Sequence, residues 1–433
     1  MRLLIFSPAT LASAIGRGTQ LVVQELATQG HESVVVRYED IAHLGTPTRA
    51  FGVGTVSWDE TSQVEAFAQT SDAVVYQIGD NYQFHRGCLE WLPRLPGVVC
   101  LHDYFVGNLF CGWSEQRRPQ ARAILRAWYG EAVAERYPSF RTSQELIEGT
   151  HETAPMTEWV TSMATGVVTH SSWGIQRVLD ACPGPVHVVP LPYSAPGLGH
   201  GPMSDLQAPS DTFNVLTIGH VNPNKRAESV IRAIGNSALL RKKSLYRLVG
   251  LVDSSVSQQL TDLADSLNVD VAICGEVEEA ALQQSMGQAD VVCCLRLPSL
   301  EAASASTIEA MLCGKAVVVM DTGFYRELPD ACVRKVSPEQ EVVGLQRELE
   351  SLCMNRAERS ALGQNAAEWA LATFSAAGYA KSLAHICATA AKAAPTIEAS
   401  RFFAQMLARW GASVAGVPVS DAVAPLRIFQ NTG

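Results

Sequence analysis

Two glutamates eight positions apart, Glu301 and Glu309, are the residues that point most directly to chemistry in this sequence. The loop between them consists almost entirely of small residues, and the apolar residues 290–295 and 315–320 on either side are typical of buried strands. A carboxylate accepts hydrogen bonds from hydroxyl groups, and a loop of small residues lets backbone N–H groups approach an anion. A phosphorylated sugar presents both kinds of group, so the segment predicts a site for such a ligand.

The same segment also has a purely structural interpretation. Ser306 and Glu309 have the spacing of a capping box, in which the glutamate only satisfies a backbone N–H at a helix start. Gly314 would then follow the end of that helix. Glu301 precedes the helix in an apolar loop and has no such role, so the functional interpretation rests on the pair.

A second group of polar residues follows the apolar residues 213–218. Asn224 is in position to cap a helix in which apolar residues recur at helical spacing from Ala227 onward. Two cations in its first turn oppose the helix dipole, at about 0.3–1 kcal/mol each when exposed, and a bound anion would reverse that sign. The group predicts an anion site, with tolerated surface charges as the alternative. Its members are Gly219, His220, Lys225 and Arg226.

Polar residues also end two predicted strands in the first half of the chain. His102 and Asp103 follow residues 98–101, and a second group follows residues 73–77. A histidine at a strand end is often only structural, but its place at a predicted ligand-binding edge favours function. The second group contains Asp80, Asn81 and His85, which are candidate contacts for a sugar or an acceptor.

A glycine-rich segment near the start of the chain has a weaker signal. Gly16 and Gly18 begin a dinucleotide-binding pattern, but Leu21 occupies the position of its third glycine. Asp40 after the second predicted strand keeps a dehydrogenase open as an alternative.

The pattern along the chain predicts two α/β domains. Strands are expected near residues 3–6, 33–37, 73–77, 98–101 and 166–170, and again near 213–218, 247–252, 270–274, 291–295 and 316–320, with helical patterns between them. Such alternation is typical of doubly wound parallel sheets, which bind ligands at the carboxyl ends of their strands. The candidate residues all follow strands, so we expect a cleft between two Rossmann-like domains.

The predicted domain boundaries follow from composition. Residues 1–200 form the first domain, residues 201–212 form a linker rich in Gly, Pro, Ser and Asp, and residues 213–390 form the second domain. Residues 391–433 are expected to return to the first domain as a helical segment. Residues 105–160 form a helical insertion rich in arginine and tryptophan, which is either a solvated helical hairpin, an acceptor-binding face or a contact with anionic lipid.

The segment around the two glutamates resembles the donor-site signature of the retaining GT-B glycosyltransferases of family 4. The pattern is Glu-x7-Glu, then Ala-Met-x-Cys-Gly-x-Ala-Val-Val, then Asp-x-Gly-x-x-x-Glu-Leu ending at Leu328. Further matches follow in order between Arg2 and about Lys381. They are residues 2–8, Gly16, and residues 30–31, 99–103, 169–172, 188–192, 219–225 and 249–250.

The resemblance implies a fold and an activity. Two Rossmann-like domains of the GT-B type face each other across a cleft, and the enzyme is a metal-independent hexosyltransferase that retains configuration. The donor is a UDP- or GDP-sugar, and no further cofactor is implied. The leaving diphosphate oxygen assists deprotonation of the acceptor hydroxyl, so stabilising that leaving group is the main contribution of the protein.

The resemblance also implies roles for individual residues. Lys225 matches the family's lysine and neutralises the diphosphate, with Arg226 or with His220, which stands where the family has arginine. Glu301 binds hydroxyls of the donor sugar, Glu309 binds the ribose, and His102 orients the sugar or acceptor. The remaining donor-binding positions are glycines and backbone amides that approach the diphosphate, namely Gly16, Gly219, Ala303, Ser304, Ala305 and Ser306.

Composition agrees with such an enzyme. At 433 residues with 47% hydrophobic residues, the chain can build two sizeable cores, and its net charge of −10 offers no general attraction to nucleic acid. Eleven cysteines without a C-x-x-C pair, several of them in apolar runs such as 274 and 293–294, indicate reduced, buried thiols in a cytoplasmic protein. The apolar start is too short for a signal peptide. A cytoplasmic location, with peripheral contact at the inner membrane face through the insertion, is expected.

Two other classes of function stay open. One is a GT-B nucleotide-sugar epimerase or phosphorylase, which turns over a nucleotide sugar without a separate acceptor. The other is a non-catalytic glycosyltransferase-like subunit, which the histidine at position 220 favours. For the transferase, the expected acceptor is a carbohydrate or a lipid-linked or protein-linked group, as in bacterial-type polysaccharide or glycoconjugate synthesis.

Overall fold

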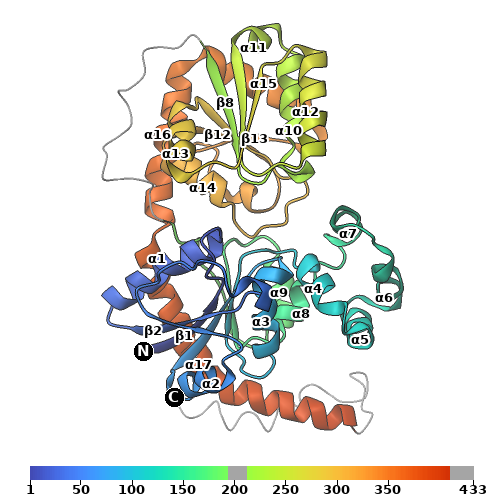
Figure 1. Cartoon of the computed structure of the whole chain (residues 1–433), viewed down its shortest axis with the longest axis vertical. Coiled ribbons are helices and arrows are strands. Elements are labelled where there is room, and N and C mark those ends of the chain that lie inside the picture. Colours follow the sequence, from blue (N-terminus) through green and yellow to red (C-terminus); the bar gives the residue numbers. More distant parts are fainter. Residues whose placement is uncertain (194–211, 410–433) are drawn as a thin grey trace. The chain divides into compact units, whose positions relative to one another are not determined.

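Strands and helices alternate along residues 1–193 and 212–409, which are the residues that the computed structural model describes. Their contacts divide them into two units (Figure 1). The first unit contains Met1–His170, Gly174–Val189 and the chain from Tyr379 onward, and the second contains Ser171–Trp173 and Pro190–Gly378. The first unit thus takes up the chain again at Tyr379, before the predicted position 391. The predicted linker at 201–212 lies outside the described residues except for Thr212.

The first unit is built on a seven-stranded parallel sheet with the order β3-β2-β1-β4-β5-β6-β7. Its central strands are runs of Val, Ile and Leu that are buried on both faces, as expected for a parallel sheet covered by helices. The strands are β1 (Arg2–Ser7), β2 (Glu32–Arg37), β3 (Gly54–Ser57), β4 (Ala73–Ile78), β5 (Val98–Leu101), β6 (Gly166–Thr169) and β7 (Val186–Val188).

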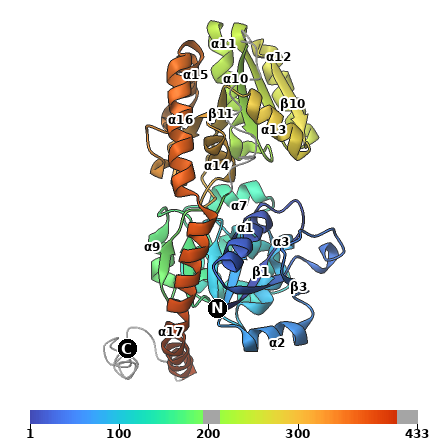
Figure 2. The ribbon, with the colours of Figure 1, turned by 90° about the vertical axis from the view of Figure 1, so that its left-hand side faces the viewer.

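Helices cover both faces of this sheet. On one face, α1 and the long C-terminal helix α17 pack their apolar residues against alternate residues of β1, β4, β5 and β6 (Figure 2). On the other face, Phe6 and Tyr76 stack with ring centroids 4.5 Å apart and Trp91 of α3 lies against Phe6. The helices are α1 (Ala14–Thr28), α2 (Thr61–Thr70), α3 (Tyr82–Trp91), α9 (Ile175–Ala181) and α17 (Ala376–Arg409).

The insertion between β5 and β6 is a group of five helices rather than a hairpin. Its aromatic residues mostly form its own core, with Phe110 and Trp113 packed on Trp159 at centroid distances of 4.9 and 5.0 Å. Three of its six arginines pair with glutamates, as Arg122 does with Glu131 at 2.7 Å. The helices are α4 (Gly107–Ser114), α5 (Arg118–Tyr129), α6 (Glu131–Arg136), α7 (Ser143–Thr150) and α8 (Thr157–Thr161).

The second unit is built on a six-stranded parallel sheet with the order β10-β9-β8-β11-β12-β13. Alternate residues of each strand enter two separate cores, one on each face. The strands are β8 (Phe213–Ile218), β9 (Ser244–Val249), β10 (Val271–Gly275), β11 (Val291–Cys294), β12 (Ala316–Met320) and β13 (Arg334–Val336).

Each core of the second unit is covered mainly by a different group of helices, although Leu362 of α16 enters the core on the side of α10. Helices α10, α12 and α15 pack on one face, and α13, α14 and α16 pack on the other (Figure 1). The helices are α10 (Ala227–Gly235), α11 (Ala238–Lys243), α12 (Ser254–Leu267), α13 (Glu279–Gln288), α14 (Ala305–Leu312), α15 (Glu341–Met354) and α16 (Arg356–Thr373). All ten strands predicted from the sequence are present. The three that were missed, β3, β7 and β13, are short strands of three or four residues at sheet edges.

The helix that returns to the first unit carries part of its core. Leu383 of α17 is 1% exposed among the sheet residues, so Leu383→Ala is expected to destabilise the protein by about 2–5 kcal/mol through lost burial and a cavity. Lys381→Ala on the exposed side of the same helix is the matched control and should change stability by less than about 0.5 kcal/mol. Urea unfolding of the full chain measures both. Equal stabilities for the two variants would contradict the role of α17 in the core.

Candidate functional site

The two sequence motifs of the second unit meet where the strand order of its sheet reverses. In this sheet β8 has β9 on one side and β11 on the other, so the loops after β8 and β11 diverge toward opposite faces. Such a switch point is the usual ligand-binding place of an open α/β sheet. Lys225 follows β8 and Glu301 follows β11, so the fold brings together residues that are 76 positions apart in the sequence.

Close backbone approaches place Lys225 beneath the end of β8. Gly219 has a φ of +86°, and a Cβ there would lie 2.6 Å from the Lys225 Nζ. Gly250 after β9 has a φ of +140°, and a Cβ there would lie 2.3 Å from the Gly219 carbonyl oxygen. Both positions therefore require glycine. The Lys225 ammonium occupies the space that the missing Cβ of Gly219 leaves, and it donates a hydrogen bond to the Ile218 carbonyl.

Lys225 carries its charge in an unfavourable place. The residue is only 5% exposed. Burial, and then repulsion by Arg296, lower the pKa of its ammonium to about 7, while Glu301 opposes the shift. A bound anion would offset both the burial of the ammonium and its repulsion by Arg296. The sequence motif had likewise predicted that Lys225 binds an anion.

The surroundings of Lys225 differ from the predicted helix start. Residues Pro223–Lys225 form a 3-10 turn, and Arg226 is the N-cap residue of α10 with a φ of +58°. Asn224 is therefore not the cap; its side-chain amide donates to the Pro298 carbonyl instead. The prediction of two cations in the first turn is also wrong, since that turn carries Glu228.

Arg226 is engaged elsewhere. Its guanidinium donates to both carboxylate oxygens of Glu341 at the start of α15, at 2.7 and 2.5 Å. Bidentate pairing of this kind fixes a guanidinium strongly. His220, the other predicted partner of Lys225, is exposed on the loop after β8.

Glu301 is held by two neighbours. The Tyr325 hydroxyl donates to its Oε1 at 2.5 Å, and the Arg296 Nε lies 3.3 Å from the same oxygen. Burial, and then the Glu301 charge, raise the pKa of Tyr325 well above 10, so this phenol stays a donor. Glu301 Oε2 has no hydrogen-bond partner among the described residues, which leaves one carboxylate oxygen for a ligand.

Arg296 is a buried cation that our sequence reasoning missed. It lies two residues after the end of β11, between Leu295 and Leu297, and is 8% exposed. Its Nη1 donates to the Leu295 carbonyl at 2.8 Å. The signal in the sequence was the charge itself, because an arginine between Leu295 and Leu297 at the end of a buried strand needs a partner.

We predicted Glu309 in the first turn of its helix, but it is the fifth residue of α14 and lies just beyond that turn. Helix α14 begins at Ala305, and its N-cap is Ser304, whose Oγ accepts from the Thr307 N–H at 3.4 Å. The capping box formed by Ser306 and Glu309 is therefore absent. Instead, Glu309 Oε2 accepts a hydrogen bond of 2.9 Å from the Tyr193 hydroxyl. The carboxylate is half-buried and its second oxygen has no described partner.

The small residues of the loop surround this helix start. Ala303 and Ser304 are buried, whereas Ala305 and Ser306 are half-buried. The hydroxyls of Ser304 and Ser306 lie 3.1 Å apart. Of the predicted amide donors, Ala305 and Ser306 are the first residues of α14 and Ala303 and Ser304 directly precede it, at the helix end where N–H groups and the helix dipole favour an anion.

In the first unit, His102 lies at the end of β5 as a neutral imidazole. Its Nε2 lies 2.7 Å from the Gln77 Oε1, and its ring lies 4.8 Å from the ring of His170. Burial, and then the neighbouring His170 and His85, hold the pKa of His102 well below 6.5. His102 is therefore a weak base that accepts or donates hydrogen bonds without carrying charge.

The other polar residues of this edge have structural partners. Asp80 accepts from the Leu109 N–H at 2.9 Å and from the Asn108 side chain at 2.6 Å, and so anchors the start of α4. Asn81 is the N-cap of α3. Asp103 accepts from the Asp80 N–H at 2.8 Å, and buried His85 contacts the Tyr38 hydroxyl through Nδ1 at 2.9 Å.

Gly16 also has a structural explanation. It lies in the first turn of α1, not in a loop, and a Cβ there would meet the Pro8 carbonyl oxygen at 2.5 Å. Glycine thus permits the close approach of α1 to the end of β1.

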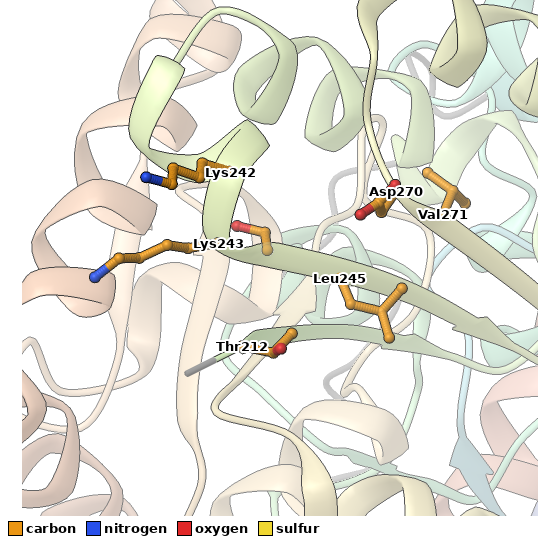
Figure 3. Close-up of a pocket in the computed structure, with 7 residues that line it drawn as sticks. Thr212, Lys242, Lys243, Leu245, Asp270 and Val271 are labelled. Atoms are coloured by element: carbon orange, nitrogen blue, oxygen red, sulfur yellow. The ribbon is translucent and has the colours of Figure 1, made fainter. Parts of the chain in front are cut away.

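A pocket of the second unit lies away from these residues. It has a volume of about 430 Å³ and is lined by Thr212, Lys242, Lys243, Ser244, Leu245, Asp270 and Val271. These residues lie at the amino ends of β8, β9 and β10, at the opposite edge of the sheet from the switch-point residues. The Lys242 and Lys243 side chains extend away from Asp270 (Figure 3).

Further features bear on the predicted chemistry. All eleven cysteines are free thiols, and Cys274, which we expected to be buried, is exposed at the edge strand β10. Within residues 1–193 and 212–409, no three His, Cys, Asp or Glu side chains gather as metal ligands would. None of the described helices combines the length and the apolar character needed to cross a bilayer.

Comparison with known proteins relates this arrangement to a family. Residues 203–369 match the family model described as Glycosyl transferases group 1, and this segment contains the second-unit residues from Gly219 to Glu309. No curated protein matches the chain in sequence.

Solved structures match over most of the chain. Sucrose-phosphate synthase from Thermosynechococcus elongatus has a TM-score of 0.62 and 15% identity, over 89% of this chain and 98% of that one. Alr3699/HepE from Anabaena in complex with UDP has a TM-score of 0.57 and 16% identity, over 89% and 99%. WaaG, a glycosyltransferase involved in lipopolysaccharide biosynthesis, has a TM-score of 0.55 and 15% identity, over 89% and 99%. The chain thus has the α/β fold of GT-B glycosyltransferases, with two Rossmann-like parallel-sheet domains.

Proposed function

We propose that this protein is a retaining glycosyltransferase that transfers a hexosyl unit from a UDP- or GDP-sugar to an acceptor hydroxyl. The observation that carries the proposal is the placement of Lys225 and Glu301 on the two loops of the switch point, within the segment that matches the group 1 glycosyl transferase model. The structure of HepE with UDP supports UDP as the first nucleotide to test.

The donor diphosphate binds at Lys225 and at the backbone amides around the start of α14. Charge that develops on the leaving diphosphate is stabilised there by the ammonium, which its own surroundings disfavour in the absence of an anion. The amides of Ala303, Ser304, Ala305 and Ser306 add hydrogen bonds without adding a titrating group.

The two glutamates bind hydroxyl groups of the donor. Glu301 uses Oε2 for a sugar hydroxyl, because Tyr325 and Arg296 both hold its Oε1. Glu309 uses Oε1 for a ribose hydroxyl, because Tyr193 holds its Oε2. Each carboxylate therefore has one oxygen fixed by the protein and one oxygen for the ligand.

The acceptor is deprotonated with the help of the leaving diphosphate oxygen, on the front face of the sugar. A protein base is not needed in this reaction, and His102, whose pKa is well below 6.5, orients a hydroxyl instead. We propose a carbohydrate, lipid-linked or protein-linked acceptor in polysaccharide or glycoconjugate synthesis. The insertion of residues 105–160 holds six arginines and seven glutamates, a balance that favours a polar acceptor over an anionic lipid surface.

The direct test is a thermal-shift screen with UDP-sugars and GDP-sugars, followed by product analysis. A nucleotide present at about 100 times its Kd adds about 2.7 kcal/mol to the free energy of unfolding, which such a screen detects. The hit is then incubated with and without acceptors, and NMR assigns the anomeric configuration of the product. Turnover that needs no acceptor would favour an epimerase or phosphorylase, and an inverted product would contradict retention.

Replacement of Lys225 separates binding from folding. Lys225→Met keeps the side-chain volume but removes a charge whose pKa in the folded state, about 7, lies below its ordinary value of about 10.4. The lysine therefore costs stability below pH 7, and that cost fades as the pH rises above 7. At pH 6.5 the unliganded variant is expected to melt above wild type, while its affinity for the nucleoside diphosphate falls at least about tenfold, the loss of one charged hydrogen bond. Calorimetry and melting curves measure both.

The same lysine predicts a pH dependence. Wild-type affinity for the nucleoside diphosphate is expected to fall as the pH rises from 7 to 8.5, because the free protein loses the Lys225 proton there. In Lys225→Met the fall should vanish, apart from any titration of the ligand itself. An identical slope in both proteins would refute the diphosphate role of Lys225.

Glu309→Gln tests the ribose contact. Glutamine keeps a hydrogen-bond acceptor for Tyr193 but not the charge, so melting temperature should change little while nucleotide affinity drops by about 1.5–3 kcal/mol. Tyr193→Phe is the matched control, because it removes the hydrogen bond between Tyr193 and Glu309 but leaves the carboxylate in place. Titration calorimetry with UDP and GDP decides the question. Unchanged affinity in Glu309→Gln would return Glu309 to a structural role.

A further inference from the structure

The cations at the switch point outnumber the anions. Lys225 and Arg296 are 5% and 8% exposed, and the carboxylate beside them is Glu301. The remaining titratable groups around them are Tyr325, which donates to Glu301, and Cys294, whose thiol is buried and has a raised pKa. Both stay neutral near pH 7, so whenever Lys225 is protonated the described side chains leave one buried positive charge without a counter-charge.

Burial of an uncompensated charge is costly, so an excess of this kind needs an explanation. The cation best placed to bind an anion beside Lys225 is Arg296. Its Nε faces Glu301 and its Nη1 faces the Leu295 carbonyl, while its Nη2 has no hydrogen-bond partner among the described residues and is not closed off from solvent.

The backbone of Arg296 is braced in this position. Its carbonyl accepts a hydrogen bond of 3.1 Å from the Thr322 hydroxyl, and that hydroxyl lies 2.9 Å from the Ser299 hydroxyl. The loop after β11 is thereby tied to the loop after β12. A guanidinium on a braced loop binds an anion with little loss of conformational freedom.

The two cations that the sequence had suggested are less suitable. Arg226 is held by both oxygens of Glu341, and its release would leave that buried carboxylate unpaired. His220 is exposed, and an imidazole lacks the fixed charge and the forked geometry of a guanidinium.

We propose that Arg296 is the second cation of the anion site, and that it binds the donor diphosphate together with Lys225. The proposal rests on the function proposed above, since it names the partner of Lys225 in the same site. Nε stays on Glu301 while Nη2 reaches a phosphoryl oxygen. Arg296 thus connects the diphosphate to the carboxylate that binds the sugar, and both parts of the donor are oriented by one side chain.

The experiment measures binding of UDP, GDP, inorganic pyrophosphate and uridine to the full chain by calorimetry. Arg296→Gln should weaken binding of the nucleoside diphosphate and of pyrophosphate about 10- to 100-fold, the loss of one charged hydrogen bond, and change uridine binding by less than about threefold. His220→Ala and Arg226→Gln are the controls and should keep diphosphate affinity within about threefold. Arg296→Lys, which keeps the charge but loses the fork, should fall between wild type and Arg296→Gln.

Folding is checked by melting curves, because Arg296→Gln removes the ion pair between Arg296 and Glu301. If that variant unfolds, Arg296→Gln with Glu301→Gln removes both charges and should show the same loss of pyrophosphate binding. Wild-type affinity in the Arg296 variants, or an equal loss in His220→Ala, would overturn the proposal and leave the glycosyltransferase intact. Arg296-dependent binding of pyrophosphate without binding of either nucleotide would overturn the proposed donor instead. A wild-type protein that binds none of the probes would overturn both.

Discussion

A buried ammonium and a buried guanidinium that share one carboxylate form the constraint on which the second unit depends. Lys225 stays in place because Gly219 and Gly250 leave room for it and the Ile218 carbonyl accepts its hydrogen bond. Arg296 stays in place because Glu301 and the Leu295 carbonyl face it. Glu301 is the one carboxylate beside these two cations among the described residues, so one positive charge is not neutralised when both carry their protons. This arrangement is the basis of the anion site proposed above, and an anion bound there would raise the stability of the folded state.

The order of strands explains why these residues meet. Strands β8 and β11 are neighbours in the sheet, although two other strands separate them in the sequence, and their following helices α10 and α14 lie on opposite faces. The loops between strand and helix must diverge, which opens space at the carboxyl ends of these two strands. The hydrogen bond from the Asn224 side chain to the Pro298 carbonyl ties the two loops together. The residue that looked like a helix cap in the sequence thus fixes one loop to the other.

The sequence predicted the central strands well because they are continuous runs of Val, Ile and Leu, a pattern that two-sided burial imposes. It missed β3, β7 and β13, since an edge strand of three or four residues is defined by its neighbour and leaves little pattern of its own. In the candidate site it predicted Lys225 and Glu301, whose residue types stand out in their loops and which the fold places at the same switch point. It misplaced the N-caps of α10 and α14. For α14, Ser304 and Ser306 are equally good N-caps, and only the path of the chain after β11 selects Ser304. For α10, the Asn224 side chain bonds to the Pro298 carbonyl instead of capping the helix. Arg296 was missed because its place between two leucines predicts burial but does not show that it lies beside Lys225 and Glu301.

The first unit shows the complementary case, in which most polar residues at strand ends serve the fold. Asp80 anchors α4, Asn81 caps α3, and Asp103 accepts from the Asp80 N–H. His102 differs, because its partner fixes its protonation. The Gln77 Oε1 lies 2.7 Å from the His102 Nε2, and an amide oxygen can only accept a hydrogen bond. The His102 Nε2 must then carry the proton, and Nδ1 keeps a lone pair. The His102 Nδ1 has no hydrogen-bond partner among the described residues, so it is able to accept a hydrogen bond from a hydroxyl group of a ligand.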